Sequence, residues 1–235
     1  MDKTNDSPRA VEIFSFDEGR ATSPIAAKVW RTRSVPIDTF TSVAKTHWLM
    51  VVTKHRGRTS LTVRGPETKA STVPIPQDTD FLGIQFRVGT FMPKLPVARL
   101  VDRDLTLPAA GTRTFWLNGS AWEFPTLDNV DVFLQRLTRR GLVVHDPLVD
   151  AAHLGRHVEL SSRSMWRRIR HATGLTLGLI RQIERAEHAL TLLERGATIL
   201  DVVAHAGYAD QPHLTRSLHR FLGHTPSRIV RGHAR

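Results

Sequence analysis

The residues best suited to chemistry are arginines and polar side chains on two segments of the C-terminal half. The segment 161–173 carries four arginines within eight residues: Arg163, Arg167, Arg168 and Arg170. The segment 210–222 carries Gln211, His213, Arg216 and Arg220. Arginine can form paired hydrogen bonds with guanine or phosphate, and glutamine can do so with adenine. These residue types predict contacts with nucleic acid, although a solvated helix face would also be rich in arginine.

The net charge points the same way. The 235 residues include 33 Lys and Arg against 22 Asp and Glu, a formal charge of +11. From residue 139 onward there are 15 arginines, no lysine and 8 acidic residues. A basic balance favours polyanionic partners, whereas a genome rich in G and C would also favour arginine codons. Composition alone therefore leaves both explanations open.

Two helix–turn–helix units are predicted to present these side chains. In the second unit, 199–206 reads as a short helix, Gly207 supplies the turn, and Asp210 caps a helix with a buried stripe at 214, 218 and 221. In the first unit, 148–158 is the leading helix, and Ser161 caps a helix that runs to about Thr173. Its residues at 165, 169 and 172 face inward.

A long helix over 177–195 is predicted to join the two units. Its apolar stripe comprises Leu179, Ile180, Ile183, Ala186, Leu190 and Leu193. At a rise of about 1.5 Å per residue it would span ~28 Å. That length approaches the ~34 Å repeat of B-DNA, so the two units can reach successive major-groove segments.

The first half of the chain is predicted to be β-rich. Strand-length runs occur at 11–16, 25–30, 47–53, 60–63 and 81–88, which favours a barrel or a two-sheet sandwich. A helix capped by Asp128 and ended by Gly141 follows, and 142–147 connects to the helical region. We therefore expect an α+β chain with a β-rich domain at 1–126, a helix and linker at 127–146, and an all-α domain at 147–235.

The C-terminal segment resembles the AraC/XylS family of transcription regulators. The resemblance rests on Ala206–Pro226, the hallmark stretch of that family, and on 154–174, which ends in the arginine-rich helix. Leu218, His219, Glu159 and Ile229 depart from the usual residue types. The resemblance implies sequence-specific binding to double-stranded promoter DNA by the two helix–turn–helix units. It further implies a cupin-like N-terminal β-barrel that senses a small ligand or mediates dimerisation.

The resemblance assigns roles to individual residues. The residues expected to read bases are Arg163, Trp166, Arg167, Gln211, Pro212, His213 and Arg216. Those expected to contact DNA phosphates are Ser161, Arg168, Arg170, Thr215 and Arg220. Trp166 could pack on thymine methyl groups or bury itself against the linker helix. In the β-rich domain, the expected ligand pocket is lined by Trp30, Trp48, Phe86 and Trp116, although aromatic residues at strand spacing are more often core.

Other functions are less well supported. Two histidines precede His145, His47 and His55, and no metal-binding pattern surrounds them, so we expect no metal, no cofactor and no enzymatic activity. Cysteine is absent, and the N-terminus does not resemble a signal peptide. We expect a cytoplasmic regulator that contacts RNA polymerase and can form a homodimer through 116–124 and the helix at 128–140. Activation is the expected mode, but the residues do not distinguish it from repression, nor ligand control from a ligand-independent barrel.

Overall fold

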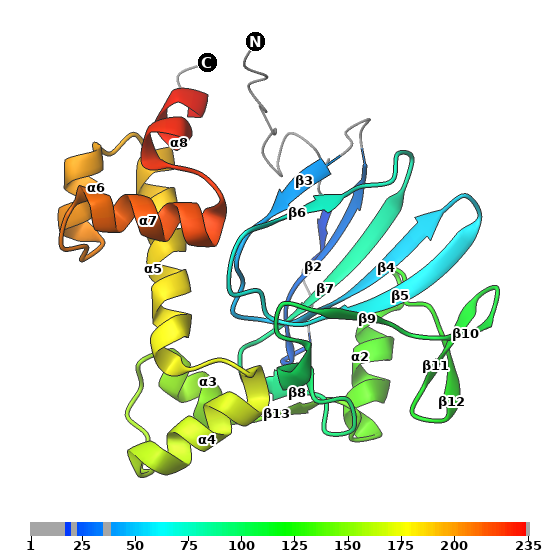
Figure 1. Cartoon of the computed structure of the whole chain (residues 1–235). Helices are drawn as coiled ribbons and strands as arrows, with labels where there is room; N and C mark the ends of the chain where they lie inside the picture. Colours follow the sequence, from blue (N-terminus) through cyan, green and yellow to red (C-terminus); the bar gives the residue numbers. More distant parts are fainter. Residues whose placement is uncertain (1–16, 20–22, 35–38, 234–235) are drawn as a thin grey trace.

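The computed structural model describes residues 17–19, 23–34 and 39–233. Figure 1 shows a β-rich region followed by a helical region, as the α+β prediction requires. The strand predicted at 11–16 lies outside the described residues.

The largest sheet is antiparallel and has six strands in the order β1-β2-β7-β4-β5-β9. These strands are β1 (Asp17–Gly19), β2 (Ala26–Arg33), β7 (Asp80–Phe86), β4 (Leu49–His55), β5 (Arg58–Arg64) and β9 (Asp104–Thr106). Four of them overlap predicted strands, because their apolar side chains are buried. Met50, Leu61, Ile84 and Phe86 are each fully enclosed.

Shorter pairings complete the β-rich region. β3 (Thr39–Ser42) pairs with β6 (Ser71–Pro74), and β8 (Thr90–Phe91) pairs with β13 (Val144–His145). β10 (Ala109–Gly111), β11 (Thr114–Leu117) and β12 (Ser120–Glu123) form a three-stranded sheet. A 3₁₀ helix, η1, covers Val97–Leu100. Among the described residues these pairings form four separate sheets, so a closed cupin-like barrel stays a prediction.

Helix α2 (Val130–Arg139) packs its apolar face on the β-rich region. Val130, Phe133, Leu134 and Leu137 join the same core as Trp48, Ile84 and Phe86. The predicted cap at Asp128 is wrong. Asn129 is the N-cap residue, and its side chain accepts a hydrogen bond from the Thr126 amide at 2.8 Å instead of capping the helix.

The helical region contains α3 (Pro147–His153), α4 (Ser162–Thr173), α5 (Leu177–Glu194), α6 (Ile199–His205), α7 (Gln211–Leu222) and α8 (Pro226–His233). The helix predicted at 148–158 ends at His153, because Gly155 takes φ = +70° and turns the chain. The other predicted helices lie within one or two residues of their observed bounds.

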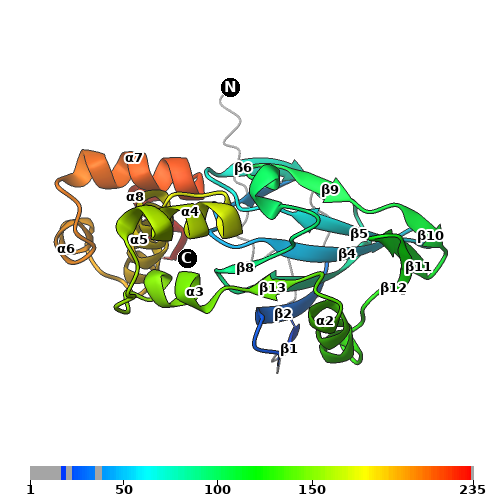
Figure 2. The same ribbon diagram turned by 90° about the horizontal axis from the view of Figure 1, so that it is seen from below.

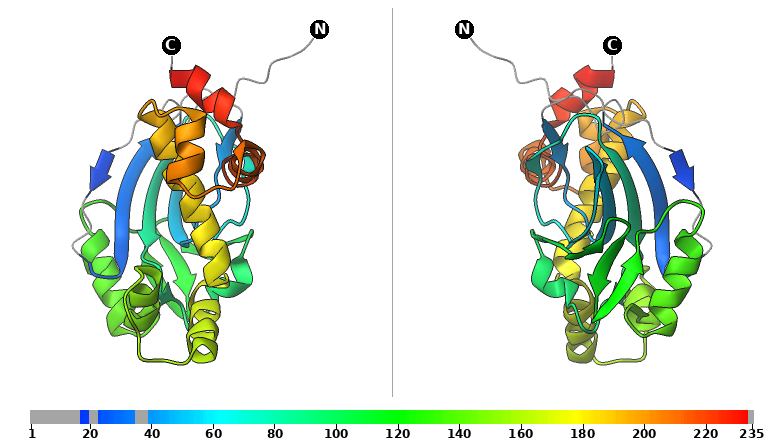
Figure 3. Two further views of the ribbon diagram at one scale, coloured as in Figure 1. Left: turned by 90° about the vertical axis from the view of Figure 1, so that its left-hand side faces the viewer. Right: turned by 90° about the vertical axis from the view of Figure 1, so that its right-hand side faces the viewer.

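The linker helix α5 separates two small cores. Its N-terminal half packs with α3 and α4, and its C-terminal half packs with α6, α7 and α8. The β-rich region contributes a buried residue to each: Val88 to the first and Ala44 to the second. Figure 3 shows α5 in front of the strands in its left view and behind them in its right view, so α5 lies to one side of the β-rich region.

Candidate nucleic-acid interface

Helix α4 is defined by local signals at both ends. The Ser161 hydroxyl accepts a hydrogen bond from the Ser164 amide at 3.3 Å, and Gly174 ends the helix at φ = +74°. Met165, Ile169 and Ala172 face the core, as predicted. The opposite face is therefore left to the arginines and Trp166.

Helix α7 repeats this plan 49 residues later. The Asp210 carboxylate accepts a hydrogen bond from the His213 amide at 2.6 Å, and Gly223 ends the helix at φ = +75°. Leu214, Leu218 and Phe221 are buried at the positions equivalent to 165, 169 and 172. Arg216 consequently occupies the position in α7 that Arg167 occupies in α4.

The two helices lie on the same side of the molecule. Figure 1 shows α4 at the N-terminal end of α5 and α7 crossing the C-terminal half of α5, and Figure 2 shows both on one side of it. The 18 residues of α5 give a length of about 27 Å at the usual helical rise. That length is of the same order as the ~34 Å repeat that separates successive major-groove segments on one face of a duplex.

Six of the seven side chains predicted to read bases are exposed on these helices, and His213 is half-buried. Trp166 is 65% exposed, so it does not bury itself against the linker helix. His213 packs edge-on against Tyr208, with 5.1 Å between ring centroids. The structure therefore exposes six of the seven predicted side chains on α4 and α7.

The predicted phosphate-contacting residues divide into two groups. Arg170 and Arg220 are exposed, and Thr215 is half-buried. Ser161 serves as the α4 cap, and Arg168 donates from Nη1 to the Asp146 carboxylate at 2.7 Å. Asp146 belongs to the segment between the two regions and also caps α3. Arg168 thus ties α4 to that segment.

The C-terminal ends of both helices contact the β-rich region. At α7, the Ala44 amide donates to the Phe221 carbonyl at 2.7 Å, and the Ala70 amide donates to the Arg220 carbonyl at 2.8 Å. At α4, the backbone around Gly174 approaches Ala98 and Val101 so closely that a Cβ would lie 2.6 Å from Val101. These contacts hold the C-terminal end of each helix against the β-rich region, whereas the first residues of each helix are exposed to solvent.

A hydrogen-bonded bridge links the two contact points. Asp102, next to Val101, accepts from the Thr68 amide at 2.7 Å and from the Thr68 hydroxyl at 2.6 Å. Thr68 lies two residues before Ala70. The β-rich region therefore forms a second connection between α4 and α7, in addition to α5.

The four aromatic residues predicted to line a ligand pocket do not surround one cavity. Trp48 and Phe86 stack with 3.7 Å between centroids and are almost fully buried, so they fill the core. The Trp30 ring covers Gly83 on the neighbouring strand, where a Cβ would lie 2.1 Å from it. Trp116 is 46% exposed on β11. Sequence spacing could not predict which of these aromatic side chains are buried in the core and which are exposed, because burial depends on the strand that lies alongside each of them.

A groove of about 560 Å³ lies elsewhere in the β-rich region. It runs between β2, β4, β5 and β7 on one side and the segments at 112–113 and 123–129 on the other. Its polar wall carries three cations and three carboxylates: Arg31, Lys54, Arg113, Asp80, Glu123 and Asp128. The sequence analysis missed this groove, since its residues come from six separate segments.

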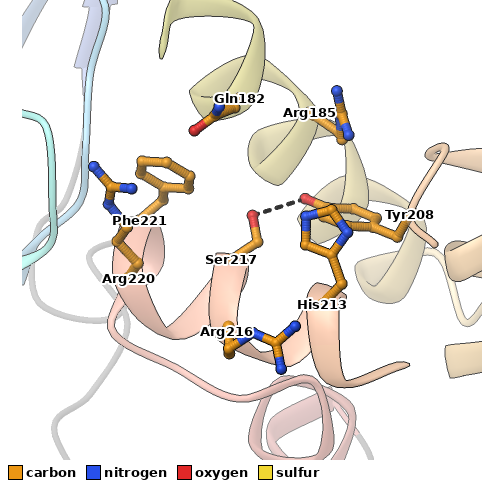
Figure 4. Close-up of a pocket in the computed structure, with 8 residues that line it drawn as sticks. All are labelled: Gln182, Arg185, Tyr208, His213, Arg216, Ser217, Arg220 and Phe221. Atoms are coloured by element: carbon orange, nitrogen blue, oxygen red, sulfur yellow. Dashed lines mark hydrogen bonds between the residues drawn. The ribbon is translucent and has the colours of Figure 1, made fainter. Parts of the chain in front are cut away.

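A second, smaller cavity of about 270 Å³ lies between α5 and α7. Figure 4 shows its lining residues, which include Arg185 of α5 and the hydrogen-bonded pair Tyr208 and Ser217. None of these three was predicted as a site residue. The sequence did contain one indication of Arg185, because this arginine lies outside the apolar stripe of the linker helix and was therefore expected on its polar face.

Titratable side chains also join α3 to α5. His153 Nδ1 lies 3.0 Å from Glu184 Oε1, and this carboxylate raises the pKa of His153.

In the part of the chain that the structure describes, no three His, Cys, Asp or Glu side chains are grouped to hold a metal ion. No helix among those residues is long and apolar enough to cross a bilayer.

Comparison with known proteins identifies the helical region. Residues 154–232 match a family model described as a helix-turn-helix domain. The matched residues include α4, α5, α6 and α7, and thus both exposed helices. Comparisons with curated proteins and with solved structures gave no significant match.

Proposed function

We propose that this DNA-binding transcription regulator reads two adjacent major-groove segments of promoter DNA. The premise is that residues 154–232 form a helix-turn-helix domain of the AraC/XylS type. The observation that carries the proposal is the pair of equivalent helices, α4 and α7, on one side of α5. Arg163 and Arg167 would read bases from α4, and Gln211 and Arg216 from α7. Trp166 would contact thymine methyl groups.

In the proposed mode of action, a small effector controls this binding from the β-rich region. The groove of about 560 Å³ is the site we assign to the effector, in place of the four aromatic residues. Its mixed cations, carboxylates and apolar side chains suit a small polar molecule with an apolar part. The regulator would act in the cytoplasm on RNA polymerase, as an activator and without enzymatic activity.

A ligand-independent regulator is the second candidate, and the interdomain contacts favour it. The β-rich region buries Ala44 and Val88 in the two helical cores, so it can position α4 and α7 without any effector. The apolar face of α2 packs on its own region rather than lying free for a second copy. In this candidate, the β-rich region acts as a scaffold for the DNA-reading helices.

A footprint on the DNA upstream of the chain's own gene tests the proposal. The purified full-length protein should protect two segments about one helical turn apart, roughly 10 base pairs. Addition of a small-molecule extract of the cells should change the protection if an effector exists. The Lys54→Ala variant should retain the basal footprint and lose the response. Absence of any protected segment on this DNA and on a randomised duplex pool would contradict DNA reading. A footprint that no extract alters would favour the ligand-independent candidate.

A further inference from the structure

The cavity between α5 and α7 has the chemistry of an anion site. Its eight lining residues are Gln182, Arg185, Tyr208, His213, Arg216, Ser217, Arg220 and Phe221, and none is acidic (Figure 4). In the described part of the chain, no carboxylate forms an ion pair with any of the three arginines. Positive charge without a carboxylate neighbour favours an external anion.

Contacts within the protein fix the positions of three residues that line the cavity, Tyr208, Ser217 and Arg185. The Tyr208 ring is buried, and its hydroxyl lies 3.0 Å from the Ser217 hydroxyl. Arg185 stacks over that ring at 5.6 Å and donates from Nη1 to the Gly207 carbonyl at 3.2 Å. A guanidinium has five N–H donors, so donors remain for an anion after this bond is made.

A tyrosine hydroxyl ordinarily keeps its proton at neutral pH. Burial raises the pKa of Tyr208 further, so this hydroxyl remains a donor. Either hydroxyl of the Tyr208 and Ser217 pair can therefore donate to an oxygen in the cavity. Arg220, at the other end of the cavity, lies over the Phe221 ring at 4.9 Å. The site thus combines hydroxyl donors with guanidinium groups at both ends.

The position of the cavity identifies where an anion would come from. Gln182 and Arg185 lie near the middle of α5, between the end of α5 that packs with α4 and the half that α7 crosses. If the major groove of one duplex receives both α4 and α7, the phosphate backbone between the two groove segments would face the part of α5 that lies between these helices. Phosphate oxygens accept hydrogen bonds from arginine and from hydroxyl groups.

We infer that this cavity binds one phosphate group, and that the DNA backbone between the two major-groove segments supplies it. The inference rests on the proposed function. It assigns Arg185, Gln182, Ser217 and Tyr208 a role in DNA affinity that does not depend on base sequence. Arg185 on the linker helix thereby becomes part of the DNA-binding surface.

Salt dependence of DNA binding tests the inference. The full-length protein and its Arg185→Gln variant are titrated with a duplex recovered by selection from a randomised pool. Loss of one phosphate contact should reduce the slope of log K against log salt by about 0.9, with base preference unchanged. Arg58→Gln, which removes a charge from the β4–β5 hairpin, is the matched control and should leave the slope unchanged.

A second pair of variants guards against an effect on folding. Arg185 also holds the turn at Gly207, so thermal unfolding is measured for each variant, and Arg185→Lys should restore the slope. Gln182 is exposed on α5, and Gln182→Glu adds a negative charge to the cavity without removing a contact that Arg185 makes. This variant should weaken DNA binding at low salt, whereas Gln135→Glu on α2 should not.

Duplexes with single neutral methylphosphonates identify the phosphate. A methylphosphonate between the two groove segments should weaken the wild type and have little effect on Arg185→Gln. Equal effects on both proteins, or an unchanged salt slope, would overturn the inference. Stabilisation by inorganic phosphate that Arg185→Gln abolishes, without any difference in DNA binding, would assign the cavity to a free anion and also overturn it. If the wild type binds no duplex at all, the proposed function itself fails.

Discussion

Arg167 and Arg216 occupy equivalent positions on α4 and α7, each six residues after the N-cap residue. Both side chains are exposed, and each can form two hydrogen bonds to a guanine. Loss of one such contact should cost about 1–3 kcal/mol and relax preference at one base pair. Because α5 separates the helices, the two arginines should affect different halves of the site.

The corresponding prediction concerns specificity. Arg167→Ala should weaken base selection in one half of the site, and Arg216→Ala in the other half, roughly 10 base pairs away. Binding selections on randomised duplexes with each variant measure this. If both variants relax the same base pairs, or if affinity falls uniformly without a change in preference, the two arginines contact only phosphates.

His153 predicts a pH dependence of stability. Glu184 raises the pKa of His153 from 6.5, so the folded protein holds this proton more tightly than the unfolded chain. The stability that this pair contributes is therefore fully present below pH 6.5 and is lost as the pH rises through the raised pKa. Since the pair is partly exposed, its contribution should not exceed about 1 kcal/mol.

Urea unfolding of His153→Gln measures that contribution. The variant should be less stable than the wild type at pH 5.5 and nearly as stable at pH 8.5. His188→Gln changes an exposed histidine on α5, the helix that carries Glu184, and should show no such difference. A stability loss that is equal at both pH values would assign His153 a packing role.

At the scale of elements, helices α4 and α7 could be predicted almost in full, because their signals are local. A capping side chain, an apolar stripe and a terminal glycine all lie within 14 residues in each, from Ser161 to Gly174 and from Asp210 to Gly223. The early end of α3 was missed, since Gly155 acts through its backbone conformation. Four strands of the six-stranded sheet were predictable from their buried residues.

The remaining elements depend on contacts that no local pattern encodes. The short strands β8 and β13 lie more than 50 residues apart and pair only because the fold brings them together. The same holds for the predicted ligand pocket. Trp48 stacks on Phe86 across neighbouring segments, and its indole N–H donates to the Thr90 carbonyl at 2.6 Å. Residue type alone could not distinguish such core packing from a pocket wall.

The terminal glycine of α4 gives a prediction at this scale. Gly174→Ala would force a Cβ into a backbone conformation that costs roughly 1–2 kcal/mol and also against Ala98 and Val101. Gly155→Ala is the control, because Gly155 has φ = +70° and no atom within 4 Å of the added Cβ. Urea unfolding and DNA titration should therefore show a larger loss for Gly174→Ala. Equal losses would mean that contact with the β-rich region does not restrain α4.

At the scale of the whole molecule, two connections hold α4 and α7 at a fixed separation. One is α5, and the other runs through the β-rich region from the α4 end at Val101, across the Asp102 and Thr68 hydrogen bonds, to Ala70 at the α7 end. A single helix can bend or twist, whereas two connections restrict both motions. The β-rich region should therefore determine how strictly the protein demands one spacing between its half-sites.

The Asp102→Gly variant tests this second connection. Asp102 has φ = +55°, a conformation that glycine adopts without strain, so the change removes the carboxylate and spares the backbone. The hydrogen bonds involved are exposed and should contribute about 1 kcal/mol to the restraint. The variant should bind the selected duplex with nearly wild-type affinity. On duplexes with one or two base pairs inserted between the half-sites, it should lose less affinity than the wild type.

Asp104→Ala changes an exposed carboxylate two residues away and should keep the wild-type spacing preference. If Asp102→Gly discriminates between spacings as strictly as the wild type, α5 alone sets the separation of α4 and α7.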